Sequence, residues 1–281
     1  MLLAAYVERY ALETALGPRT VENYRGSVAR FSHWLGHPAR MADLTDDAAN
    51  RWLVAILDRG RSPKTAKNER NALLALWRAA YESRLVERRP DRIRKIRVPV
   101  SLPEAWDERQ LVALLAVAAL LPGKLRRWRL PKAAFFRALI LAGYDSGLRL
   151  ADLLALRWDQ IGADGSVAVL QQKTRWPILA RLRPETLAAL DQIGREGQPL
   201  VFGGVISRRQ LFAHFGRLVR LAGLSGGTRK LRRSGASLLE RVCPGAAQYY
   251  LGHRGPNLAA RYYIDPRVAG QNRPLPPPLA G

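Results

Sequence analysis

The sequence predicts a mainly helical protein of two domains, with a small β-sheet in the second domain. Its length of 281 residues suits two domains. The first hundred residues show apolar side chains at helical spacing alone. A valine-rich alternating stretch at 166–172, followed by a short strand at 176–179, predicts one β-hairpin. The predicted parts are a first domain (1–96), a basic linker (97–104), a second domain (105–270) and a proline-rich tail (271–281) that is extended or mobile.

Local signals predict four helices in the first domain. Their ends are marked by residues that suit helix termini: Gly17-Pro18, Thr20 as a cap, Gly36, Thr45 before Asp46 and Asp47, Gly60, and Ser62-Pro63. The fourth helix would bury a stripe of apolar residues: Leu73, Leu76, Trp77, Ala80 and Tyr81. Its first turns carry Lys64, Lys67 and Arg70, which form either a solvated face or contacts to a nucleic-acid backbone. In a chain this basic, we favour the backbone contacts.

The second domain is predicted to alternate helices with one hairpin. Asp107 and Gln110 have the spacing of a capping box for a helix over 108–121. A basic loop follows, then a helix over 133–144, a turn at Gly147 and a short helix over 150–156. Lys173 lies at the tip of the hairpin. Further helices are expected at 184–193, 207–221, 229–241, 246–251 and 258–263.

Positive charge dominates both predicted domains. The net charge is +23, and the isoelectric point is near 11.2. Residues 1–98 hold 19 Lys and Arg against 11 Asp and Glu, and the remaining residues hold 27 against 12. A charge this large opposes compaction, so it indicates a polyanionic partner, and nucleic acid is the leading candidate.

Other features narrow the class of protein. The single cysteine, Cys243, excludes an internal disulfide framework and a cysteine-rich metal site. The four histidines show no metal-ligand spacing. The N-terminus meets charge too early for a signal peptide, and the longest apolar run, 111–121, is too short to cross a bilayer. We therefore expect a cytoplasmic protein without a membrane segment.

Two arginine segments suggest chemistry on a phosphate. Arg149 follows the Gly147 turn at the start of an apolar helix, and Asp152 lies three residues later, where it could orient the guanidinium. Arg232 lies in a second basic segment, 228–236. A guanidinium fork binds two phosphate oxygens at once, so two such groups could neutralise a phosphodiester. The alternative for Arg149 is a structural ion pair with Asp152, and for Arg232 a nonspecific phosphate contact.

Lys173, His253 and Tyr262 could complete such a site. A lysine at a hairpin tip can reach a leaving oxygen as a general acid, although a lysine at such a position, taken alone, is more often a solvated turn residue. A tyrosine hydroxyl has a pKa of about 10, so it needs neighbouring cations to act as a nucleophile at neutral pH. Tyr262 follows His253 by nine residues, and its alternative is an aromatic that packs with Tyr263.

The order of these segments resembles the tyrosine recombinase (phage integrase) family. The resemblance rests on Leu148-Arg149, Lys173, Arg232, Leu251-Gly252-His253 and Arg261-Tyr262, and it covers nearly the whole chain. It implies a helical core-binding domain that clamps DNA, followed by a mixed α/β catalytic domain. It also implies that Arg149 and Arg232 clamp the scissile phosphate and that Lys173 protonates the leaving 5′ oxygen. His253 would bind the phosphate or assist proton transfer, and Tyr262 would attack to form a 3′-phosphotyrosine.

The resemblance also implies partners. It implies no metal, ATP or organic cofactor, and a homo-tetramer acting on two double-stranded DNA sites. Because the chain begins almost directly at the core-binding helices, we expect the simple two-domain type. The DNA target sequence and the biological role are not readable from these residues, since helix-face lysines mostly contact the backbone.

Three positions depart from or blur the family pattern. Arg229 stands where the family usually has histidine, and an arginine cannot act as a general base because it stays protonated. Asp152 is shorter than the usual glutamate, and Tyr263 competes with Tyr262 for the role of nucleophile, although the spacing favours Tyr262. Two alternatives therefore remain: a topoisomerase-like nicking and closing enzyme, or a DNA-binding accessory protein that has lost catalysis.

Overall fold

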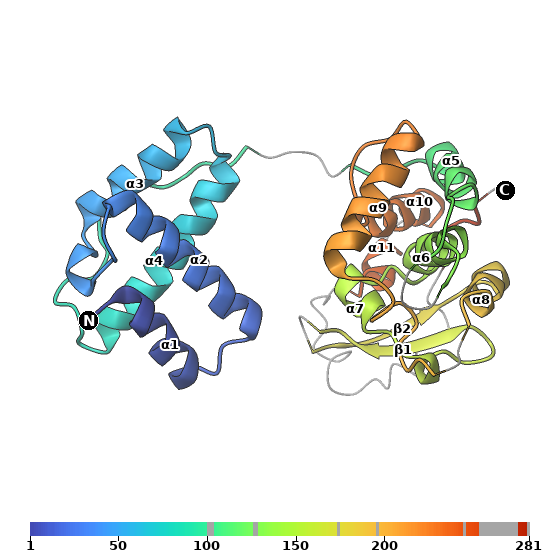
Figure 1. The fold of residues 1–281 in the computed structure, drawn as a ribbon, viewed down its shortest axis with the longest axis horizontal. Coiled ribbons are helices and arrows are strands. Elements are labelled where there is room, and N and C mark those ends of the chain that lie inside the picture. Colours follow the sequence, from blue (N-terminus) through green and yellow to red (C-terminus); the bar gives the residue numbers. More distant parts are fainter. Residues whose placement is uncertain are drawn as a thin grey trace. The chain divides into compact units, whose positions relative to one another are not determined.

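A computed structural model describes residues 1–99, 104–125, 129–172, 175–194, 197–243, 246–252 and 275–279. The chain forms two compact units, Met1–Leu102 and Pro103–Gly281. Helices dominate both, and the described strands form one two-stranded sheet in the second unit (Figure 1). The prediction of a mainly helical fold with a small sheet is therefore confirmed.

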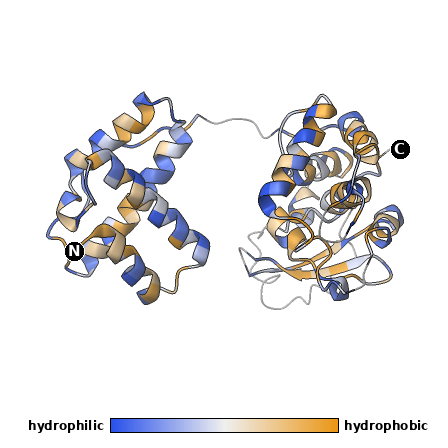
Figure 2. Ribbon diagram, viewed as in Figure 1, coloured by the Kyte–Doolittle hydropathy of each residue, from blue (hydrophilic) through white to orange (hydrophobic). Residues whose placement is uncertain are grey.

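The first unit packs four amphipathic helices around a shared apolar core. They are α1 (Leu3–Glu13), α2 (Pro18–Leu35), α3 (Asp46–Asp58) and α4 (Pro63–Glu82), with a 3₁₀ turn at Met41–Asp43. Hydrophilic and hydrophobic residues alternate along these helices in Figure 2. Phe31, Trp52 and Trp77 are almost fully buried and anchor the core. Tyr81, predicted to lie in this core, is 42% exposed instead.

Local chemistry sets most helix starts in this unit. The Thr45 and Ser62 side chains accept hydrogen bonds from the Ala48 and Thr65 amides, each at 3.2 Å, as predicted for N-caps. The predicted cap at Thr20 is wrong, because α2 begins earlier, with Gly17 as the N-cap and Pro18 in the first helical position. Proline suits that position because it lacks an amide hydrogen that the helix would leave unpaired.

The segment after α4 is fastened to the first unit. The Asp46 carboxylate accepts hydrogen bonds from the amides of Asp91 and Arg92, at 3.2 and 3.0 Å. Asn50 Oδ1 accepts from the Arg94 amide at 2.8 Å. Arg70 Nε donates to the Arg94 carbonyl at 2.8 Å. Residues 91–94 are thus part of the first unit.

The second unit is built around α6. Its elements are α5 (Glu108–Ala119), α6 (Lys132–Ser146), α7 (Leu150–Leu154), a 3₁₀ turn at Trp158–Gln160, β1 (Ser166–Leu170), β2 (Pro177–Arg181), α8 (Pro184–Asp191), α9 (Arg208–Leu221), α10 (Arg229–Val242) and α11 (Ala247–Tyr250). Helix α6 contacts α5, α7, α8, α10 and β2, so it lies at the centre of the unit (Figure 1). Eleven of its 15 residues are buried.

The hairpin and the described tail both pack against this core. Strands β1 and β2 are antiparallel, with Ser166 opposite Arg181 and Leu170 opposite Pro177. Alternate residues Val167, Val169, Ile178 and Ala180 are buried, as the predicted period of two requires. The described tail residues 275–279 have no regular secondary structure, and the Pro277 carbonyl accepts a hydrogen bond from the Tyr144 hydroxyl at 2.7 Å.

Candidate active site

The turn at Gly147 brings Arg149 to the start of α7. Gly147 ends α6 with φ of 59°, a left-handed conformation that favours glycine. Arg149 is the N-cap residue of α7, and its side chain is 33% exposed. Leu148 before it and Leu153 after it are buried, so the backbone on both sides of Arg149 is anchored in the core. The Arg149 side chain is therefore partly accessible to solvent while its backbone is fixed.

Asp152 anchors the hairpin more directly than it orients Arg149. One carboxylate oxygen, Oδ1, accepts a hydrogen bond from the Gln172 amide at 2.8 Å. The other, Oδ2, lies 4.0 Å from Arg149 Nη1. Among the described residues, neither Oδ2 nor Arg149 Nη1 has a hydrogen-bond partner, although both atoms are buried. Asp152 thus fixes the residue that precedes Lys173 and leaves an Arg149 donor free.

Arg232 connects the turn before Arg149 with the segment before His253. It lies on α10, and its Nη1 donates a hydrogen bond to the Gly147 carbonyl. Its Nη2 donates to the Leu251 carbonyl at 2.5 Å. A guanidinium has five N–H donors, so these two bonds leave donors for a ligand.

Two neighbouring positive charges define the electrostatics of the site. Burial lowers the pKa of Arg232 to about 10, and repulsion from Arg149 is the second cause. At neutral pH the guanidinium still carries its charge. A pair of cations that destabilise each other in this way is well suited to a bound anion, because the anion removes the repulsion.

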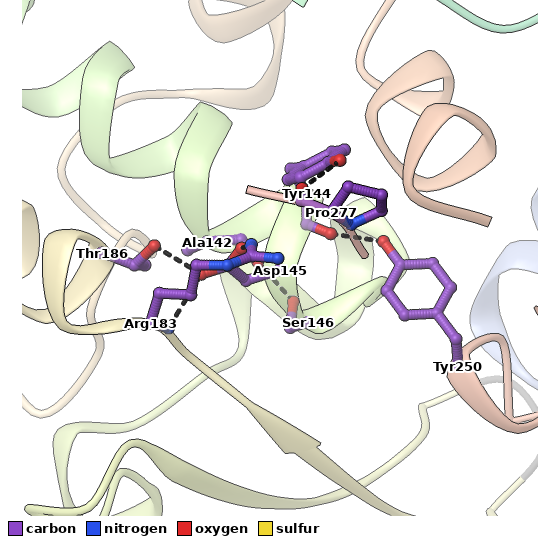
Figure 3. A network of polar contacts seen from close by, with 8 residues as sticks. All are labelled: Ala142, Tyr144, Asp145, Ser146, Arg183, Thr186, Tyr250 and Pro277. Atoms are coloured by element: carbon purple, nitrogen blue, oxygen red, sulfur yellow. Dashed lines mark hydrogen bonds and ion pairs between the residues drawn. The ribbon is translucent and has the colours of Figure 1, made fainter. Parts of the chain in front are cut away.

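A buried polar network supports the end of α6 that leads to this turn (Figure 3). Asp145 is 2% exposed and forms an ion pair with Arg183. It also accepts hydrogen bonds from the Arg183 amide at 2.9 Å and the Thr186 hydroxyl at 2.6 Å. Burial raises the pKa of Asp145, and the Arg183 charge opposes that rise. The network fastens α6 to the start of α8.

The N-terminus of α10 carries further cations. Arg229, its first residue, is exposed. Lys230 forms an ion pair with Glu104 at 3.0 Å and lies over the Trp106 ring. The Trp106 amide donates to the Ser234 hydroxyl at 2.7 Å. The residues that enter the second unit are therefore attached to the helix that carries Arg232.

The structure brings together part of the predicted site. Arg149, Asp152 and Arg232 gather around the Gly147 turn, with Arg229 one helical turn before Arg232. Lys173, His253 and Tyr262, and also Tyr263, lie outside the described residues. Sequence reasoning missed Tyr250, whose hydroxyl donates to the Tyr144 carbonyl at the end of α6. No local signal marked it, because the two residues are far apart in the sequence.

The predicted DNA-backbone residues on α4 differ in environment. Lys64 and Lys67 are exposed. Arg70 is half-buried and directs its guanidinium to the carbonyls of Arg94 and Ile93. Its contacts therefore stabilise the end of the first unit.

No group of three or more His, Cys, Asp or Glu side chains in the described residues is placed to hold a metal ion. Within the same part of the chain, no helix has the length and apolar character that crossing a membrane requires.

The described residues thus form a helical first unit and a second unit in which two arginines flank a glycine turn. The model of the phage integrase family matches residues 107–268, and that of the phage integrase N-terminal SAM-like domain matches residues 3–84. The chain therefore belongs to the phage integrase family, whose members are the tyrosine recombinases.

Named relatives are also tyrosine recombinases. Tyrosine recombinase XerC of Xanthomonas campestris pv. campestris (strain B100) is 26% identical over 215 residues, which are 73% of this chain and 64% of the relative. The chain thus spans just under two thirds of that relative's length. Tyrosine recombinase XerA of Thermococcus kodakarensis is 28% identical over 249 residues, covering 84% of this chain and 81% of the relative.

Solved structures share the fold. A lambda integrase (residues 75–356) dimer bound to a COC′ core site has a TM-score of 0.70 at 21% identity, covering 92% of this chain and 97% of that chain. XerH recombinase bound to its difH substrate has a TM-score of 0.64 at 19% identity, covering 96% and 84%. At this identity the likeness establishes the fold.

Proposed function

We propose that this protein is a site-specific DNA recombinase that cleaves and rejoins strands through a 3′-phosphotyrosine intermediate. The observation that carries the proposal is the pair of guanidinium groups at the Gly147 turn. Arg232 is bonded to the Gly147 carbonyl and repelled by Arg149, while an Arg149 donor is unpaired among the described residues. A phosphodiester would bring further negative charge next to both guanidinium groups and would accept a hydrogen bond from the unpaired Arg149 donor.

The chemistry assigns one role to each residue of the family pattern. The Tyr262 oxygen attacks phosphorus while the bond from phosphorus to the 5′ oxygen breaks. Its proton passes to His253, and Lys173 protonates the leaving 5′ oxygen. Arg149 and Arg232 hold the non-bridging oxygens, which carry the negative charge of the phosphoryl group in the transition state. The 5′ hydroxyl of a second strand then attacks the phosphotyrosine and releases Tyr262, so no external energy source is consumed.

The proposal includes partners and an assembly. The partners are two double-stranded DNA sites, and the assembly is a homo-tetramer in the cytoplasm. Support comes from lambda integrase, which has been solved as a tetramer bound to a Holliday junction, with a TM-score of 0.70 to this chain. Residues 1–96 would clamp the DNA, with exposed Lys64 and Lys67 against its backbone. Residues 105–270 would form the catalytic domain, joined through the linker 97–104.

The decisive test is covalent trapping on a nicked suicide substrate. Tyr262→Phe should abolish the protein–DNA adduct and leave DNA affinity unchanged, while the matched variant Tyr263→Phe should retain the adduct. The reverse pattern would assign the nucleophile to Tyr263. Arg149→Ala and Arg232→Ala should each slow adduct formation by roughly 10²-fold to 10³-fold, far more than they weaken binding. Equal losses in rate and affinity would reduce both to ordinary backbone contacts.

Two other functions are compatible with some of these features. A nicking and closing enzyme of the topoisomerase kind would act equally well on one site, whereas a recombinase needs two, so substrates with one and two sites separate them. An accessory DNA-binding protein is favoured by Arg229, which replaces the histidine expected from the family pattern. Absence of any adduct, with DNA binding intact, would select that function.

A further inference from the structure

The end of α6 presents carbonyl groups that need donors from elsewhere. The last carbonyls of a helix have no partner within it, and α6 ends inside the unit, next to Arg149. Two carbonyls there accept hydrogen bonds from side chains far along the chain. Tyr144 accepts from the Tyr250 hydroxyl, and Gly147 accepts from Arg232. Tyr250, unlike Arg232, has no role in the reaction proposed above.

Tyr250 is buried and its hydroxyl is held as a donor. The residue is 3% exposed and points from α11 toward the end of α6 (Figure 3). Burial raises the pKa of its hydroxyl above the ordinary value, and the neighbouring Tyr144 adds to the rise. The proton therefore remains on Tyr250 at every physiological pH, so this tyrosine serves as a hydrogen-bond donor.

The Tyr250 ring fills the space left by two glycines. A β-carbon at Gly147 would lie 2.6 Å from the Tyr250 Cζ atom, and one at Gly235 would lie at the same distance from it. Both separations are far below a van der Waals contact. Gly147 belongs to the turn before Arg149, and Gly235 lies three residues after Arg232 on α10. The Tyr250 ring thus lies between the two arginine segments.

We propose that Tyr250 is a positioning residue for strand cleavage. Its ring sets the separation between the Gly147 turn and α10. Its hydroxyl holds the turn in position through the hydrogen bond to the Tyr144 carbonyl. Arg232 bonds to both the Gly147 and Leu251 carbonyls, so a shift of Tyr250 moves the acceptors that orient the guanidinium. Tyr250 also precedes His253 by three residues. This inference rests on the proposed function, because it assumes that both arginines meet one phosphate.

A purely structural role would have a different signature. A residue that only fills the core affects stability, whereas a positioning residue changes the rate of the chemical step without changing DNA affinity. A displacement of about 1 Å at a reacting group costs on the order of 10²-fold in rate. Tyr250→Phe is the informative change, since it keeps the ring and removes only the hydrogen bond to Tyr144.

The test compares Tyr250→Phe with its neighbour Tyr249→Phe in the full chain. Tyr249 is 61% exposed and is the matched control. With saturating suicide substrate, Tyr250→Phe should form adduct about 10-fold to 100-fold more slowly, with DNA affinity within about twofold of the unmodified protein. Tyr249→Phe should match the unmodified protein. Gly235→Ala, whose β-carbon would collide with both the hydroxyl and the ring of Tyr250, should reproduce the loss of rate.

A second readout does not depend on cleavage. Amide hydrogen exchange of the protein without DNA should accelerate at residues 144–149 in Tyr250→Phe and stay unchanged there in Tyr249→Phe. Unchanged exchange, or adduct formation at the normal rate, overturns the positioning role. If the unmodified protein forms no adduct at all, the proposed function fails, and the exchange data alone decide whether Tyr250 holds the turn.

Discussion

The Gly147→Ala substitution tests the packing around the arginine turn. Alanine at this position would have to adopt φ of 59°, which costs about 1–2 kcal/mol for a residue with a β-carbon. Its methyl group would also meet the Tyr250 ring, with the nearest atom at 2.6 Å. Overpacking of this kind costs about 1–3 kcal/mol. Together these terms predict a loss of about 2–5 kcal/mol from the free energy of unfolding.

Gly223→Ala separates the conformational cost of the positive φ from the cost of overpacking. Gly223 follows α9 in the same unit with φ of 68°, but a β-carbon there would meet no atom within 4 Å. This control should therefore lose only the conformational term of about 1–2 kcal/mol. The difference between the variants, about 1–3 kcal/mol, measures the contact with the Tyr250 ring.

Calorimetry of the full chain supplies the measurement, because it can resolve the unfolding of the second unit. In a unit of this size, 1 kcal/mol shifts the midpoint by roughly 2–4 °C. The combined loss of Gly147→Ala with Tyr250→Leu should be smaller than the sum of the two single losses, since the smaller side chain leaves room for the methyl group. Equal destabilisation by Gly147→Ala and Gly223→Ala would refute the argument that the ring is packed on the turn.

Three further predictions concern the surroundings of the turn. Asp145→Ala should cost the second unit about 3–5 kcal/mol by denaturant unfolding, because it leaves the Arg183 charge buried without its partner; a loss below 1 kcal/mol would contradict the ion pair. Asp152→Ala should slow adduct formation roughly tenfold more than Asp152→Asn, because asparagine keeps an oxygen for the Gln172 amide, and equal rates would remove the anchoring role. Burial, with Lys132 and Arg217, lowers the pKa of His214, so below pH 6.5 the unfolded chain takes up a proton first and stability falls. His214→Gln should therefore shrink the drop in melting temperature between pH 7.5 and 5.5, and an unchanged drop would assign it to other groups.

Sequence patterns predicted the features that depend on near neighbours. The caps at Thr45 and Ser62 and the capping box of Asp107 with Gln110 follow from residues three positions apart, and all three form in the structure. Burial along β1 and β2 follows from a period of two. Such signals act within one turn or one strand, so a single sequence contains them in full.

Local sequence patterns did not predict the contacts between residues that are far apart in the chain. Arg70 has the spacing of an exposed helix-face cation, yet it binds carbonyls 23 and 24 residues away. Asp145 pairs with Arg183 across 38 residues, and Tyr250 reaches Tyr144 across 106. Each contact depends on how helices pack, and packing is not encoded in local periodicity. The arginines could be recognised because they match a family pattern, but the residues that hold them in place match no sequence pattern.

Arg229 bears on how the site handles protons. It is exposed on the first turn of α10, where the positive end of the helix dipole already disfavours a cation. A guanidinium at this position offers N–H donors that a phosphate could accept. Arg229 can thus strengthen the hold on a phosphate, but it cannot accept a proton, because it stays protonated. The bonds from Arg232 to Gly147 and Leu251 do not involve position 229, so the Arg232 guanidinium is held in place without a histidine there. In the proposed reaction, Arg229 therefore takes no part in proton acceptance, a role that the proposal gives to His253.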